Sequence, residues 1–132
     1  MKTFEETAND ESGTIYKDWY EKGVRCIIMR GPCSLCAYLG ILETHPLANR
    51  NYDDIPLEVH GGLTFSDRGD SYRPKGFYWY GWDYAHSGDY PFYNLKYPIY
   101  ESGSGKKWTV EEVEAEVRYA LPDFKKLMKI AE

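Results

Sequence analysis

The sequence predicts an α+β fold in a single domain, with a twisted antiparallel sheet of about four to five strands and a C-terminal helical segment packed on one face. Short runs rich in aromatic and β-branched residues, separated by glycine and proline turn signals, fill residues 14–83. A pattern with helical spacing follows from residue 109. The 132 residues, 42% of them hydrophobic, suffice for one modest core and not for two domains.

The charge balance and the distribution of apolar residues argue against some classes of partner and indicate where in the cell the protein is expected. It carries 21 acidic and 16 basic residues, a net charge of -5, which argues against a nucleic-acid partner because phosphates need neutralising. There is no apolar stretch of about 18 residues that could span a membrane, so we expect a soluble, cytoplasmic protein with no membrane partner. Residues 1–13 are interpreted as a polar, partly disordered lead-in to the domain at 14–132.

The first half of the domain has the pattern of an antiparallel meander. Residues 14–22 and 24–29 predict a hairpin that turns at Gly23, and 36–42 predict a further strand. A polar connection rich in turn-forming residues then covers residues 45–56.

The next strand is predicted at residues 57–65, where apolar and polar side chains alternate. Gly61 and Gly62 interrupt it, which favours a bulge or a close approach by a ligand or by other backbone. The alternation puts His60 on a polar face that would be the functional face of the strand. The two faces are Leu57, Val59, Leu63 and Phe65 on one side, and Glu58, His60 and Thr64 on the other.

A strand at residues 76–83 is aromatic on both faces, so its periodicity does not say which face is inside. Residues 85–107 then form a long irregular segment, and such segments in compact domains are functional or mobile. The faces of the strand are Phe77, Trp79 and Asp83 on one side, and Tyr78, Tyr80 and Trp82 on the other.

The C-terminal helix begins at a capping box formed by Thr109 and Glu112. Pro122 is expected to end or kink this helix and to start a second one. The charged side chains at 112, 114, 116 and 118 are interpreted as its solvated face. The apolar stripe consists of Val110, Val113, Val117, Ala120, Leu121, Phe124, Leu127 and Met128.

Two segments, residues 60–64 and 82–89, hold two of the three histidines beside glycines, carboxylates and aromatic residues. If the segments meet in the fold, they form a polar site on an aromatic floor. The side chains concerned suit a divalent metal or acid-base chemistry. They are His60, Asp83, His86 and Asp89.

The local sequence of the second segment bears on the shape of that site. Because Ser87-Gly88 argues against a helix, the side chains of residues 83–89 are expected to splay around a turn. The alternative to a functional site is a plain hydrogen-bonded turn, in which Asp83 and Asp89 accept backbone amides.

Two other residue classes could carry chemistry. Cys33 and Cys36, with Cys26 nearby, could form a redox pair or a zinc knuckle, but buried or incidental thiols are favoured because no helix start lowers a thiol pKa there. The 13 tyrosines could present rings that stack on planar ligands, or could cover an exposed sheet or an interface. The aromatic cluster comprises Tyr78, Tyr80, Trp82, Tyr84, Tyr90, Phe92, Tyr93, Tyr97 and Tyr100.

A series of motifs in the chain resembles a family of small proteins of phages and prophages. The series is His45-Pro46-Leu47, then VHGGLTF at 59–65, then GWDYAHSGD at 81–89, then an acidic helix after 107–109, and the similarity spans about residues 15–121. The resemblance implies a mobile-element context, where accessory proteins interfere with host defences by binding a protein or sequestering a nucleotide signal. It implies no particular reaction, and Tyr84 stands where the family favours a small residue.

The leading hypothesis is therefore a non-enzymatic phage or prophage accessory protein in the host cytoplasm that counters host defence. It would bind a small polar, nucleotide-like ligand or a host protein, with no cofactor. The residues expected to contact the ligand are His60, Thr64, Asp83, His86 and Asp89, with Tyr80 and Trp82 stacking on it.

Two alternatives remain open. In the first, His60, Asp83, His86 and Asp89 hold a metal that activates water, and the protein is a metal-dependent hydrolase. In the second, the tyrosine-rich surface binds another protein or a second copy of the chain, forming a homo-oligomer.

Overall fold

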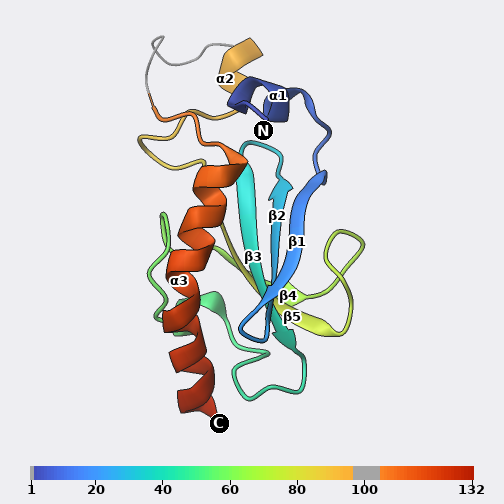
Figure 1. Cartoon of the computed structure of the whole chain (residues 1–132), viewed down its shortest axis with the longest axis vertical. Helices are drawn as coiled ribbons and strands as arrows, with labels where there is room; N and C mark the ends of the chain where they lie inside the picture. Colours follow the sequence, from blue (N-terminus) through green and yellow to red (C-terminus); the bar gives the residue numbers. More distant parts are fainter. Residues whose placement is uncertain (1, 97–104) are drawn as a thin grey trace.

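The structure, a computed structural model that describes residues 2–96 and 105–132, consists of one antiparallel sheet with a long helix along one face (Figure 1). This confirms the predicted α+β fold. The strands lie in the order β1-β2-β3-β5-β4. In chain order the elements are α1 (Phe4–Asn9), β1 (Ile15–Glu21), β2 (Val24–Arg30), β3 (Leu35–Leu42), the 3-10 helix η1 (Tyr52–Asp54), β4 (Phe65–Arg68), β5 (Phe77–Asp83), α2 (Tyr93–Lys96) and α3 (Val110–Ala131).

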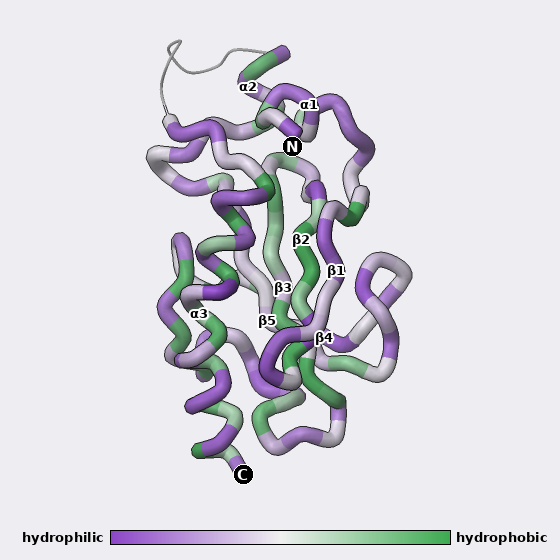
Figure 2. Tube along the Cα trace, viewed as in Figure 1, coloured by the Kyte–Doolittle hydropathy of each residue, from purple (hydrophilic) through white to green (hydrophobic). Residues whose placement is uncertain are grey.

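Strands β1, β2 and β3 form the meander that the sequence predicts. Lys22 and Gly23 have φ of 54° and 79°, the backbone of a two-residue hairpin turn, and Glu21 pairs with Val24 across it. Figure 2 shows hydrophobic residues along β2 in the middle of the sheet and hydrophilic ones along β1 at its edge.

The strand predicted at residues 57–65 is wrong for most of its length, because pairing begins only at Phe65. Gly61 and Gly62 have φ of 69° and 78°, and the Gly62 amide donates to the Val59 carbonyl at 2.9 Å. The glycines therefore make a turn, and His60 lies at this turn rather than on a strand face. The turn also ends the expected alternation, so Leu57 and Phe65 join cores on opposite faces of the sheet.

Strand β5 is buried on both faces, which explains why its periodicity is uninformative. Tyr78, Tyr80 and Trp82 face α3, whereas Trp79 packs in a second, smaller core on the other face. The large rings of this second core lie opposite glycines in the neighbouring strand. Trp79 pairs with Gly40, and Tyr38 pairs with Gly81. A Cβ added at Gly40 would lie 2.6 Å from the Trp79 ring, so the missing side chain provides the space.

Helix α3 begins as predicted, since Thr109 and Glu112 form both bonds of the capping box. Pro122, however, neither ends nor divides the helix, which runs from Val110 to Ala131. A proline costs one backbone hydrogen bond there, and the apolar stripe packs against the sheet on both sides of it, at Val117 and at Phe124.

The N-terminal segment differs from the predicted lead-in. Residues 4–9 form α1, and Phe4 is buried against the rings of Tyr90 and Phe92. The Arg30 guanidinium also donates to the carbonyls of Thr7 and Ala8, which attaches α1 to the end of β2. A helix of this length needs such contacts, because short helices are marginal in isolation.

The expected tyrosine-rich surface is mostly core. Of the aromatic cluster, Tyr97 and Tyr100 lie outside the described residues, and Tyr93 is 38% exposed. The other members are at most 9% exposed, so they pack the interior instead of presenting rings to a ligand or partner. They are Tyr78, Tyr80, Trp82, Tyr84, Tyr90 and Phe92.

None of the helices in the described parts of the chain is both long and apolar enough to cross a membrane.

Candidate functional site

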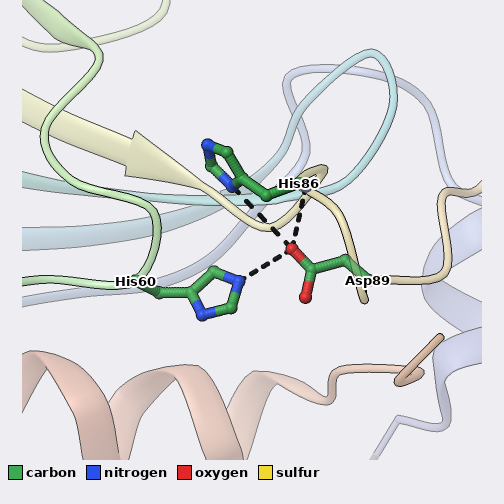
Figure 3. A group of neighbouring side chains, drawn as sticks. All are labelled: His60, His86 and Asp89. Carbon is green, nitrogen blue, oxygen red and sulfur yellow. Dashed lines mark hydrogen bonds and ion pairs between the residues drawn. The ribbon is translucent and has the colours of Figure 1, made fainter.

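The two histidine-containing segments meet, as predicted. The Nε2 atom of His60 lies 2.7 Å from the Oδ2 atom of Asp89, and the backbone amide of His86 donates to the same oxygen at 2.9 Å (Figure 3). One carboxylate oxygen thus joins the turn before β4 to the turn after β5. The site residues lie far apart in the sequence and assemble only through the fold.

The turn that carries His86 and Asp89 is held at both ends. The Asp89 amide donates to the His86 carbonyl at 2.9 Å, with Gly88 at φ 92°, so the segment is a turn and not a helix, as expected from Ser87-Gly88. A parallel bridge joins Asp89 to Lys106. Gly105 permits this approach, since a Cβ there would lie 2.7 Å from the backbone of Asp89.

Asp89 is the buried centre of the site, with a side chain only 3% exposed. Burial acts to raise its pKa, but hydrogen bonds from His60, the His86 amide and Trp108 outweigh burial and hold the pKa below its usual range. The carboxylate is therefore ionised at neutral pH. Its partners in the described residues are imidazole, amide and indole groups, and none of them is a lysine or arginine side chain.

An aromatic wall orients His60. Its ring stacks on Tyr84 with centroids 4.6 Å apart and an interplanar angle of 10°. The indole of Trp108 meets the imidazole at 5.0 Å and donates through Nε1 to Asp89 Oδ1 at 2.8 Å. The Tyr84 hydroxyl donates to Glu116 on α3 at 2.6 Å. His60 is thus fixed both by packing and by hydrogen bonding, which lowers the entropy lost when it binds a ligand.

His86 is positioned by Gly61. A Cβ at Gly61 would lie 2.4 Å from the Cε1 atom of the His86 ring, so only glycine fits against the imidazole. The Nδ1 atom of His86 is buried and makes no hydrogen bond, although it lies 3.5 Å from Asp83 and 3.8 Å from Asp89. A buried nitrogen with an unused lone pair or proton is costly unless a partner binds there.

Three of these side chains fit a metal ion. His60, His86 and Asp89 each offer one ligand atom, and the three atoms lie within 4.8 Å of one another. Two imidazole nitrogens and a carboxylate oxygen suit divalent transition metals such as Zn²⁺. The unpaired Nδ1 of His86 supports the fit, and Trp108 supplies the outer hydrogen bond that such carboxylates commonly receive.

Of the remaining predicted site residues, two lie beside the His60–His86–Asp89 cluster and two are buried in the core. Asp83 lies beside the cluster with its side chain 33% exposed, and Thr64 donates to it at 3.3 Å. Trp82 is 1% exposed, and its indole donates to the Tyr84 hydroxyl at 3.0 Å. Tyr80 is fully buried, and its hydroxyl donates to the Leu47 carbonyl. The stacking of Tyr80 and Trp82 on a ligand, which the sequence predicts, is therefore wrong, because β5 turns both rings into the core under α3.

Two residues of the site, Trp108 and Glu116, were not predicted from the sequence. Trp108 precedes the capping box and carries no recognisable motif of its own. Tyr84 was expected to stack on a planar ligand, but its ring stacks on His60 instead. Glu116 was assigned to a solvated helix face, but its carboxylate accepts the Tyr84 hydroxyl. A glutamate on the same side of the helix as Val113 and Val117 was the one available signal.

The cysteines do not converge on a second centre. Cys26 belongs to the core under α3, whereas Cys36 belongs to the core on the other face of the sheet. Burial raises the pKa of Cys26 to about 12 and that of Cys36 to about 11, which leaves both as unreactive thiols at neutral pH. These two therefore match the expectation of buried thiols, and Cys33 is exposed.

No protein-family model matches the chain, and comparisons with curated proteins and with solved structures also give no match.

Proposed function

We propose that the protein is a metal-centred ligand-binding domain, in which His60, His86 and Asp89 hold a divalent transition-metal ion that binds a small polar ligand. The observation that carries the proposal is the convergence of these three ligand atoms within 4.8 Å. The buried, unpaired Nδ1 of His86 and the ionised, buried carboxylate of Asp89 support it. Three protein ligands leave open positions on the ion for a ligand atom or a water.

The geometry also indicates what the ion competes with. Because Asp89 is ionised, the Nε2 of His60 carries the proton of their 2.7 Å hydrogen bond. A metal ion held by His60 and Asp89 would replace that proton, so metal binding is expected to weaken as the pH falls.

Calorimetric titration of the untagged protein with Zn²⁺, after dialysis against a chelator, tests this proposal. We expect one ion per chain, and a loss of affinity of about 100-fold or more in His60→Ala and in His86→Ala, because each removes a direct ligand. His45→Gln is the matched control, since His45 lies elsewhere and accepts the Leu47 amide. Absence of a one-to-one site, or equal losses in all three variants, would refute a metal centre at His60.

Hydrolysis at the same ion is the second candidate, and Asp83 favours it. Its partly exposed carboxylate is not among the three ligands and lies 3.5 Å from His86 Nδ1. An ion held by the three ligands would lower the pKa of a water beside it. The Asp83 carboxylate would accept the proton that this water loses as it attacks an ester or amide, and would return that proton to the alcohol or amine released when the C–O or C–N bond breaks. The zinc-loaded protein is then expected to hydrolyse p-nitrophenyl esters, and Asp83→Asn to retain zinc and lose turnover. Lack of turnover in the zinc-loaded protein would leave ligand binding alone.

The phage or prophage context rests on the motif resemblance alone, and with it the proposed interference with a host defence in the host cytoplasm. It adds a biological reason for a small domain to capture a ligand or a host protein.

A further inference from the structure

A groove of about 450 Å³ lies beside the metal-ligand cluster, between residues 58–60 and α3. His60 is part of both the metal-ligand cluster and the groove, because its Nε2 contacts Asp89 and the residue also lines the groove. Figure 1 shows the segment before β4 running alongside α3, which places the groove on the same side of the molecule as the long helix.

The charged side chains that line the groove have one sign. Glu58 comes from the irregular segment and Glu116 from α3, and the lining includes no lysine or arginine. The Tyr84 hydroxyl donates to Glu116 at 2.6 Å, so this carboxylate is held at the groove wall instead of moving freely in solvent. Two carboxylates facing one hollow attract a cation and repel a phosphate or carboxylate ligand.

The rest of the groove is lined by apolar and aromatic residues, among them Val59, Ala115 and Tyr119. Trp82 contributes to the lining although it is only 1% exposed, and Tyr119 stands at the groove with 85% of its surface exposed. Because Trp82 is buried, the ring that a flat apolar body can contact is that of Tyr119, and aromatic faces also attract organic cations. The volume of the groove, the negative charge of its carboxylates and its exposed tyrosine therefore favour the same class of ligand.

We propose that the groove binds a small organic cation, an amine attached to a flat apolar body, with the ammonium group between Glu58 and Glu116 and the apolar body against Val59 and Tyr119. This inference goes beyond the proposed function, because an ammonium group has no lone pair with which to coordinate the ion and the groove lies beside the three metal ligands. It also revises the nucleotide-like ligand expected from the sequence, since a phosphate would face two carboxylates.

Binding of 2-phenylethylamine, followed by the amide and indole signals in ¹H–¹⁵N spectra, tests the inference on chelator-treated and zinc-loaded protein. We expect saturable shifts of the Trp82 indole signal with the amine, and none with phenylacetate or with adenosine monophosphate on the chelator-treated protein, where no ion can bind their oxygens. Glu58→Gln and Glu116→Gln are each expected to weaken binding about threefold to tenfold. Glu114→Gln is the matched control, because Glu114 lies on the same helix and pairs with Lys17 and Arg118.

The outcomes separate this inference from the metal proposal. Amine binding with normal affinity in Glu58→Gln, or equal binding of phenylacetate, overturns the cation site. Glu58 is exposed, so its replacement leaves the fold intact even if Glu116→Gln is poorly folded. Zinc binding without amine binding refutes the groove ligand and keeps the metal centre. Amine binding without zinc binding refutes the metal centre and keeps the groove ligand.

Discussion

Two turns flank strand β5, and each is organised by an aspartate whose charge is balanced differently. Before β5, Asp70 accepts the amides of Tyr72 and Arg73 and pairs with the Arg73 guanidinium at 2.6 Å. After β5, Asp89 is more deeply buried, with a side chain 3% exposed against 42% for Asp70, yet its described partners are imidazole, amide and indole groups.

The difference distinguishes a carboxylate whose charge is paired within its loop from one that we propose binds a cation. Arg73 supplies a permanent cation, and it packs over the rings of Tyr38 and Phe65 as part of the second core. The negative charge of Asp70 is therefore balanced by a cation within its own loop. Asp89 has a negative charge that nearby dipoles stabilise without cancelling, so a cation can still be accommodated beside it.

The largest expected effect is on metal affinity. Asp89→Asn is expected to weaken Zn²⁺ binding about 100-fold or more, because it removes the only charged ligand, while Asp70→Asn leaves the affinity unchanged. Competition with a chromophoric chelator measures both variants. Equal affinities in the two would break the distinction between the turns.

The same pair of variants is expected to differ in stability without metal. Asp89→Asn replaces an acceptor with an NH₂ group that faces N–H donors, which costs about 2 kcal/mol of unfolding free energy. Asp70→Asn disrupts a partly exposed ion pair and is expected to cost below about 1 kcal/mol. Urea unfolding followed by tryptophan fluorescence compares them, and a larger loss at Asp70 would reverse our ranking of the two turns.

A smaller effect is expected at the glycines that shape the His60 turn. Gly61→Ala and Gly62→Ala both impose a positive φ on alanine, at a cost of about 1 kcal/mol each. Only Gly61→Ala also displaces the His86 ring, because a Cβ at Gly62 has no atom within 4 Å. Zinc affinity is therefore expected to fall about tenfold in Gly61→Ala alone. Equal affinities in the two variants would mean that the ring position does not matter.

The smallest effect concerns pH. Burial acts to raise the pKa of Asp89, but its hydrogen bonds lower the pKa in the folded protein below the unfolded value of about 3.9. The resulting stability is present above that value and is lost as the pH falls through the folded pKa. The stability gap between the wild-type protein and Asp89→Asn should thus narrow below about pH 4. A gap that widens with acid contradicts this assignment.

The fold was largely predictable, and so was the meeting of the two histidine segments. Periodicity and turn residues located the meander, the aromatic strand and the capped helix, because these depend on local sequence. The prediction of a strand at 57–65 was wrong because alternation alone does not show that two glycines adopt positive φ and turn the chain. The burial of Tyr80 and the role of Trp108 were not predicted for another reason. Both depend on hydrogen bonds and packing between residues 19 or more positions apart, which no local pattern encodes.

The Tyr84 side chain has a consequence for how the two proposed sites respond to each other. Its ring stacks on His60, and its hydroxyl holds Glu116, so one rigid, buried group contacts both a metal ligand and a groove carboxylate. If a ligand at one site shifts this ring, the affinity of the other site for its own ligand changes. By thermodynamic reciprocity, whatever factor zinc imposes on amine affinity, the amine must impose on zinc affinity, and Tyr84→Phe should reduce both factors together.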